Sequence, residues 1–302
     1  MKIGIVGAGA VGSYFGALLQ KFGHHVTFLA RGKHLAAMQE NGLLVKREEG
    51  TFTIKGTFTD NPNDLSESEL ILFCVKSNDT KQVAEQLLPI LNDNAKILTM
   101  QNGVDNEEVL TEVFDSSRIF SCATYVQIKI EEPGIVKQQG RVKLVIGEID
   151  HLERNTCSTI VETLQKTGID TKHTGNILEK KWRKFLWNIT FNPLSAITTA
   201  TIGEILDDKH LRKTAESVCS EAMNVASKMG ITLDKNRTLE TTFSNAERAK
   251  SHKTSMLQDR LNGKPMEVES MCGYVIRKSQ RINVSVPTIR TLYSILNYLN
   301  QN

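Results

Sequence analysis

The sequence predicts an α/β domain built on a mostly parallel sheet, followed by an all-α domain. Short apolar runs alternate with helical patterns over the first half of the chain. Several of these runs are continuously apolar, as expected for parallel strands that are covered on both faces. Beyond about residue 176, β-type runs disappear and helical patterns take over. We therefore expect a first domain at 1–173 and a second, helical domain at 174–302.

The bulk composition narrows the class of protein. The chain has 302 residues, a length typical of two domains. It is 40% hydrophobic and 24% charged, which is ordinary for a globular protein with a sizeable core. A net charge of +3 argues against nucleic-acid binding, which needs clustered Lys and Arg. No apolar run reaches the roughly 18 residues of a membrane span, so we expect no membrane partner.

Cysteine usage indicates a reducing compartment. The five cysteines form an odd set without a C-x-x-C motif; they are Cys74, Cys122, Cys157, Cys219 and Cys272. This pattern matches neither a disulfide framework nor a zinc ligand set, so we expect no metal site. The first residues lack the pattern of a secretory signal. A cytoplasmic location is the simplest account.

The first domain is expected to begin with strand–helix–strand units. Apolar runs predict strands at 3–6, 25–30, 70–75 and 96–100, with a helix at 11–22 that ends near Gly23. From about 119 onward, runs rich in β-branched residues predict three antiparallel strands, at 121–130, 134–138 and 142–146. Turn signals at Pro133-Gly134 and at Gly140 separate these three strands.

A glycine motif, Gly7-x-Gly9-x-x-Gly12, lies between the first predicted strand and the first predicted helix. That context favours a Rossmann-type dinucleotide-binding loop. The alternative is a glycine-rich turn without a ligand. Gly7 allows the tight turn, Gly9 lets the pyrophosphate approach the backbone, and Gly12 lets helix and strand pack closely. The predicted loop comprises Gly7, Ala8, Gly9, Ala10, Val11 and Gly12.

The end of the second strand favours NADP(H). An NAD site usually has Asp or Glu about 20 residues after the glycine loop. Here no acid occurs between His25 and His34, and Arg31 stands at the expected position with Lys33 and His34 beside it. An arginine can pair with a 2′-phosphate in bidentate fashion. The alternative is a solvated loop of basic residues.

A polar stripe runs along the predicted helix around 180–192. Lys184, Asn188 and Asn192 are spaced i, i+4 and i+8, so they share one side of a helix that is otherwise apolar. One interpretation is a substrate pocket in which Lys184 is the cation and the asparagines donate and accept hydrogen bonds. The other is a lysine that reaches solvent and two amides bonded to nearby backbone. Pro193 is expected to kink or end this helix.

The order of the motifs resembles the ketopantoate reductase (2-dehydropantoate 2-reductase) family over about residues 2–299. The matching segments are KIGIVGAGAVG, LARG at 29–32, VK at 75–76, QNG at 101–103, KWRKFLWNITFNPLSA at 181–196, SMLQD at 255–259 and ME at 266–267. The resemblance implies a Rossmann domain followed by an all-α domain like the C-terminal domain of 6-phosphogluconate dehydrogenase. It also implies reduction of 2-dehydropantoate to pantoate by NADPH, a step of pantothenate and coenzyme A biosynthesis.

The resemblance also implies roles for individual residues. Lys184 matches the catalytic lysine that protonates the keto oxygen, and Glu267 matches a glutamate that contacts the substrate hydroxyl and the cofactor side. The implied substrate-binding residues are Asn102, Lys184, Asn188, Asn192 and Ser255. The implied cofactor contacts beyond the glycine loop and Arg31 are Lys76, Asn102, Gln127 and Glu267.

One departure from the family pattern leaves the substrate open. Ile202 stands where the family often has an asparagine that contacts substrate. A reductase of another small 2-keto acid is therefore an alternative, and a non-catalytic NADP-binding sensor is a second. A helical second domain is compatible with a homodimer, which the sequence does not show.

Overall fold

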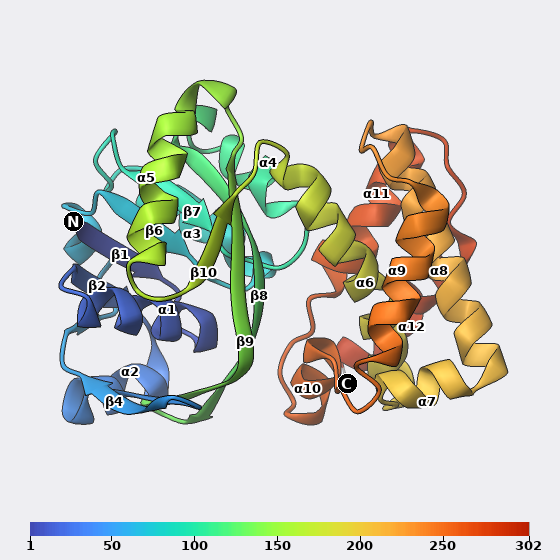
Figure 1. Ribbon diagram of the computed structural model, residues 1–302, viewed down its shortest axis with the longest axis horizontal. Helices are drawn as coiled ribbons and strands as arrows, with labels where there is room; N and C mark the ends of the chain where they lie inside the picture. The colour runs from blue at the N-terminus through green and yellow to red at the C-terminus, as the bar shows by residue number, and fades with distance from the viewer. Residues whose placement is uncertain (302) are drawn as a thin grey trace. The chain divides into compact units, whose positions relative to one another are not determined.

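A computed structural model describes residues 1–301, which form two compact units (Figure 1). The first unit comprises Met1–Asn102 and Asn106–Ile177, and the second comprises Gly103–Asp105 and the chain from Leu178 onward. The division falls after Ile177, beyond the expected boundary at 173/174, because Ile177 packs with Ala123 and Val145 of the sheet. Within the described residues, no helix combines the length and apolar character needed to cross a membrane.

The first unit is built on one sheet of ten strands in the described part of the chain. Its main order is β4-β3-β9-β8-β7-β6-β1-β2-β5, and β10 pairs with β9. The strands are β1 (Lys2–Val6), β2 (His25–Leu29), β3 (Leu43–Arg47), β4 (Gly50–Ile54), β5 (Thr57–Thr59), β6 (Leu70–Phe73), β7 (Lys96–Thr99), β8 (Ile119–Glu132), β9 (Ile135–Glu148) and β10 (Asp170–His173). The four strands predicted from apolar runs, β1, β2, β6 and β7, pair in parallel as the fold class requires.

Helices cover both faces of this sheet, which explains the continuous apolar runs. They are α1 (Ala10–Lys21), α2 (Gly32–Asn41), α3 (Thr80–Leu87), α4 (Asn106–Thr111) and α5 (Arg154–Gln165). In β6, Leu70 and Leu72 pack into the cluster that includes α1 and α5, which lie on the near side of the sheet in Figure 1. Ile71 and Phe73 pack into the cluster that includes α3 and α4. Successive side chains of a strand point to opposite faces, so both must be apolar here.

The prediction of three antiparallel strands after residue 119 is wrong in one respect. The structure has two long strands, β8 and β9, joined at Gly134, and Gly140 lies inside β9. Gly140 adopts φ 69°, and the register shifts here, with Gln127 opposite Gln139 but Tyr125 opposite Lys143. Gly140 therefore marks an irregularity within one strand pair, as glycine does in a β-bulge, and not a turn between strands.

The second unit is helical, as predicted. Its elements are α6 (Ile177–Thr198), α7 (Ile202–Asp207), α8 (Lys209–Lys228), α9 (Lys235–Glu247), α10 (Ser255–Leu261), a π-helical turn (Glu269–Gly273), α11 (Tyr274–Arg281) and α12 (Pro287–Gln301). Its core gathers around α6, whose Trp182, Phe185 and Phe191 are nearly inaccessible to solvent.

Helix α6 does not end at Pro193, contrary to one of the two expected outcomes. It continues to Thr198 with the proline inside. Proline removes one helical hydrogen bond, but Leu194 and Ala196 are buried in the core and hold the last turn. The guanidinium of Arg260 donates to the carbonyls of Ala196 and Ile197 and so satisfies acceptors at the helix end.

Candidate functional site

The glycine loop follows β1 and opens α1, and the fold itself requires two of its three glycines. Gly7 has φ 87°, and a Cβ there would lie 2.8 Å from the backbone N of Val75. A Cβ at Gly12 would lie 2.5 Å from the carbonyl oxygen of Gly7. At Gly9, by contrast, a Cβ would meet nothing within 4 Å. Packing within the chain therefore does not explain the glycine at position 9.

The start of α1 presents backbone donors without a side-chain cap. Gly9 occupies the N-cap and provides no side-chain acceptor for the first turn. The loop is held in place from the other side, because the N–H groups of Gly7 and Ala8 donate to the carbonyl of Leu29 at 3.2 and 2.9 Å. Uncapped N–H groups and the positive end of the helix dipole suit a phosphate group. The residues present thus fit a dinucleotide.

The basic loop after β2 contains fewer available cations than its sequence suggests. Arg31 is the N-cap residue of α2, and its side chain is 91% exposed. Lys33 is exposed as well. His34 is instead a structural contact: the N–H of Gly134 donates to its Nδ1 at 3.0 Å, and its Nε2 lies 3.2 Å from Oγ of Ser13. Burial lowers the pKa of His34, which favours the neutral ring that these contacts need.

Two further loops are fixed to each other by buried polar side chains. Nε2 of Gln101 donates to the carbonyl of Val75, the residue before Lys76, at 3.0 Å and to Oγ1 of Thr80 at 2.7 Å. Asn106 accepts a hydrogen bond from Thr80 at 2.9 Å and donates to the carbonyl of Asn102 at 2.7 Å. The loops that carry Lys76 and Asn102 therefore have a defined mutual position.

The structure brings the predicted cofactor residues of the first unit to one edge of the sheet. β1, β2, β6 and β7 run parallel, so the loops that follow them share an edge. These loops carry the glycine motif, Arg31, Lys76 and Asn102. Open α/β sheets bind ligands outside the carboxyl ends of their strands. Gln127 lies on β8 beyond the level of Ser121, which pairs with the end of β7, and it is exposed.

In the second unit, the polar stripe of α6 is present as predicted. Asn188 is 9% exposed and Asn192 is 2% exposed, while Lys184 is partly exposed. Oδ1 of Asn192 is buried and has no hydrogen-bond partner among the described residues. An unsatisfied buried acceptor costs about 1–3 kcal/mol. The alternative in which this oxygen is bonded to nearby backbone is therefore not observed, and the oxygen can accept a hydrogen bond from a ligand.

Ser255 lies on α10 and Glu267 lies a few residues before α11, and both of these helices contact α6. Ser255 is the exposed first residue of α10, and Glu267 is partly buried just before the helical turn that starts at Val268. α10 is tied to the end of α6 through Arg260. α11 meets α6 through Tyr274, whose ring centroid lies 6.3 Å from Trp182 and 6.4 Å from Phe185.

Ile202, at the departure from the family pattern, is a core residue. It is inaccessible to solvent and belongs to the apolar cluster of the second unit. Its N–H donates to the carbonyl of His252 at 3.2 Å. Thr201 and Glu204 form a capping box that fixes the start of this helix. An apolar side chain at position 202 is thus explained by packing alone.

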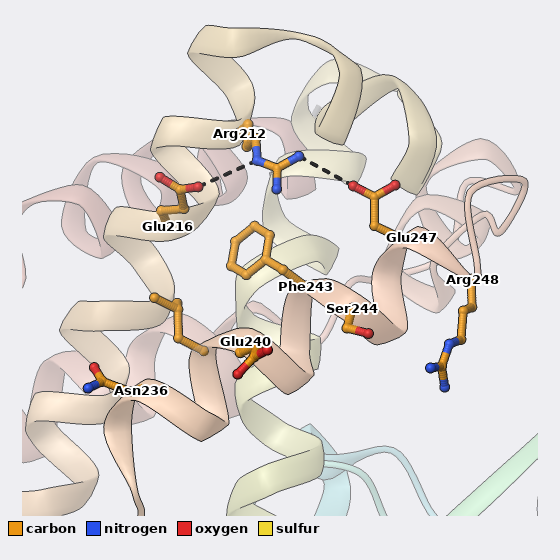
Figure 2. Close-up of a pocket in the computed structure, with 9 residues that line it drawn as sticks. Arg212, Glu216, Asn236, Glu240, Phe243, Ser244, Glu247 and Arg248 are labelled. Atoms are coloured by element: carbon orange, nitrogen blue, oxygen red, sulfur yellow. Dashed lines mark hydrogen bonds and ion pairs between the residues drawn. The ribbon is translucent and has the colours of Figure 1, made fainter.

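A cavity of about 660 Å³ in the second unit does not coincide with the predicted site (Figure 2). It lies between α8 and α9, where Arg212 is positioned over the ring of Phe243 and pairs with Glu216 and Glu247. It is lined by Arg212, Glu216, Asn236, Leu239, Glu240, Phe243, Ser244, Glu247 and Arg248. None of the predicted site residues is among them, so its size alone does not identify the site.

One cluster of metal-ligand side chains is not apparent from the sequence. Glu148, Cys157 and His173 place their ligand atoms within 4.8 Å of one another. Glu148 pairs with Phe120 of β8, and three strands, β8, β7 and β6, separate β9 from β1, which leads into the glycine loop. The carboxylate of Glu148 already has a partner, Nε2 of His173 at 2.7 Å. Their spacing along the chain matches no ligand motif, which is why only the fold reveals them.

Both units of the chain match the same family of known proteins. Residues 3–151 match the family described as ketopantoate reductase PanE/ApbA, and residues 176–300 match its C-terminal domain. The 2-dehydropantoate 2-reductase of Pyrococcus horikoshii is 31% identical over 98% of this chain and 96% of its own length. That of Archaeoglobus fulgidus is 30% identical over 98% of this chain and 96% of its own length.

The chain also resembles solved structures over its whole length. A PanE/ApbA family ketopantoate reductase from Ralstonia eutropha JMP134 superposes with a TM-score of 0.93 at 28% identity, covering 100% of this chain and 99% of its own. A D-mandelate dehydrogenase with NADH and anilino(oxo)acetate also gives a TM-score of 0.93, covering 100% and 98%. Its identity of 23% establishes the shared fold only.

Proposed function

The chain belongs to the ketopantoate reductase family, and from this premise we propose that it reduces 2-dehydropantoate to pantoate with NADPH. It is a dinucleotide-binding oxidoreductase of this family. The observation that supports the substrate site best is the unpaired, buried Oδ1 of Asn192 on the same stripe as Lys184. A helix that carries an unsatisfied buried acceptor and a lysine on the same side has the groups that a small polar keto acid requires.

The chemistry assigned to the chain is proton donation and charge stabilisation. When bound, the nicotinamide cofactor would supply the hydride for the keto carbon. Lys184 hydrogen-bonds the keto oxygen, stabilises the negative charge that develops there, and transfers its proton to that oxygen, which becomes the hydroxyl. The neutral amine then regains a proton from solvent. Asn188 and Asn192 orient the substrate through hydrogen bonds, so that the lysine meets the reacting oxygen.

The remaining residues are assigned by position in the family pattern. Asn102 and Ser255 bind the substrate, and Glu267 contacts its hydroxyl and the cofactor side. The glycine loop, Lys76 and Gln127 bind the cofactor. The open space at Gly9 and the uncapped start of α1 support the phosphate site.

A panel of keto acids tests the proposed reaction. NADPH oxidation is followed with 2-dehydropantoate, with 2-ketoisovalerate, which lacks its hydroxymethyl group, and with benzoylformate. We expect the highest kcat/KM with 2-dehydropantoate. A higher value with another keto acid would instead support the second candidate, a reductase of a different small 2-keto acid, which the absence of the family's asparagine at position 202 leaves open. Nucleotide binding without turnover of any keto acid would support a non-catalytic role.

The assignment of NADP(H) depends on Arg31. The Arg31→Ala variant is expected to raise KM for NADPH about tenfold or more, because a charge-assisted bond to the 2′-phosphate is lost. KM for NADH should change less than about twofold, since an exposed cation gives little to a neutral hydroxyl. Lys33→Ala is the matched control, as Lys33 is an exposed cation two residues away. Equal changes for both nucleotides would contradict the assignment.

A further inference from the structure

An acidic side chain lies beside Arg31, although the sequence around Arg31 contains none. Oδ2 of Asp79 is 3.3 Å from a guanidinium nitrogen of Arg31. Arg31 follows β2, and Asp79 ends a short 3-10 helix (Ser77–Asp79) that comes after β6. β2 and β6 flank β1 on its two sides. The pair therefore joins the two loops on either side of the glycine motif.

Helix capping does not explain the carboxylate of Asp79. Asp79 occupies the N-cap of α3, where an aspartate usually accepts a bond from the helix, but its side chain makes no capping hydrogen bond. Its backbone N–H donates to the carbonyl of Lys76 at 2.9 Å, a contact that any side chain would allow. The side chain is 39% exposed and contacts Arg31, which is 91% exposed. Such an exposed pair is weak, so a ligand can open it.

We propose that Asp79 is a specificity-determining residue that reduces the preference of this site for NADPH over NADH. The proposal rests on the proposed function, in which Arg31 binds the 2′-phosphate. Asp79 competes with that phosphate for the guanidinium and repels its negative charge. With NADH, the same carboxylate accepts a hydrogen bond from the ribose 2′-hydroxyl.

NAD sites recognise the ribose through an acidic side chain, and the same physical principle applies here with an acid from a different loop. An acid at the end of the second strand normally binds the ribose hydroxyl and excludes the 2′-phosphate. Here the second strand leads to Arg31, and the acid arrives from the loop after β6. The site thus contains a group suited to each nucleotide, and both nucleotides should bind.

The test is direct nucleotide binding to the full-length protein, without keto acid. We expect Asp79→Asn to tighten NADPH binding about 3- to 10-fold at low salt, since one like charge near the phosphate is removed. NADH binding should stay the same or weaken. The gain for NADPH should shrink as salt is raised, because exposed charges are screened. Glu85→Gln is the control, since it removes the same charge from an exposed position further along α3.

Two further variants keep the result interpretable. Asp79→Ser retains a residue suited to an N-cap and should give the same shift if the asparagine variant is unstable. In an Arg31→Ala background, Asp79→Asn should change NADPH affinity less, because the competition for the guanidinium is gone. Unchanged or weaker NADPH binding in both Asp79 variants would overturn the proposal. These readouts need no turnover, so failure of the keto-acid assay leaves them intact, and a wild type that binds neither nucleotide overturns both proposals.

Discussion

Replacing Lys184 with alanine is expected to lower kcat for 2-dehydropantoate reduction by about 10²–10⁴-fold, while the Kd for NADPH changes little. The reacting oxygen changes from a neutral carbonyl to an alkoxide-like oxygen as the hydride arrives. An ammonium group beside it stabilises that charge and supplies the proton. Without it, water must donate the proton, and the charge develops without an opposite charge nearby.

Lys184→Arg separates the two contributions of the lysine. Arginine keeps the positive charge but does not release its proton, because its pKa lies far above neutral pH. We therefore expect the arginine variant to remain well below the wild type in kcat. Lys180→Ala is the control, since Lys180 is a partly exposed lysine one helical turn earlier on α6. A kcat within about threefold of wild type for Lys184→Ala would contradict a role in proton transfer.

The parts of the fold that local pattern predicts are those buried on both faces. β1 and β6 appear as apolar runs because helices pack on each side of them. β5 and β10 read Thr-Phe-Thr and Asp-Thr-Lys-His, and their pairing depends on neighbouring strands rather than on their own composition. The local turn signal at Gly140 was likewise overridden by pairing between β8 and β9.

In the candidate site, too, some features could be predicted from local sequence and others could not. The glycine loop and the stripe of α6 follow from spacing within one segment. The contacts that connect distant segments do not: Asp79 meets Arg31 across 48 positions, and Gly134 meets His34 across 100. His34 therefore looked like part of a basic loop in the sequence, whereas the fold uses it as a neutral hydrogen-bonding group.

The second large effect is expected at Gly9, where alanine should strongly weaken cofactor binding without harming the fold. Gly9 has φ −77° and a Cβ there would meet nothing within 4 Å, so alanine fits the backbone. A glycine-to-alanine change at a compatible position stabilises by about 0.4–1 kcal/mol through the unfolded state. The added methyl group would occupy the space through which a pyrophosphate approaches the first turn of α1. We expect Kd for NADPH to rise by about 10- to 100-fold, equivalent to about 1.4–2.8 kcal/mol.

Gly12→Ala is the matched variant and is expected to have the opposite effect on stability. Its Cβ would lie 2.5 Å from the carbonyl oxygen of Gly7 and 2.8 Å from Ile5, so backbone must move. Overpacking of this kind costs typically about 1–3 kcal/mol, which thermal unfolding would report as a lower Tm. Gly9→Ala should keep or raise the Tm and bind the nucleotide more weakly, whereas Gly12→Ala should lower the Tm. If Gly9→Ala bound NADPH as tightly as wild type, the open space at position 9 would not be the phosphate site, and the cofactor would have to be placed elsewhere on this edge.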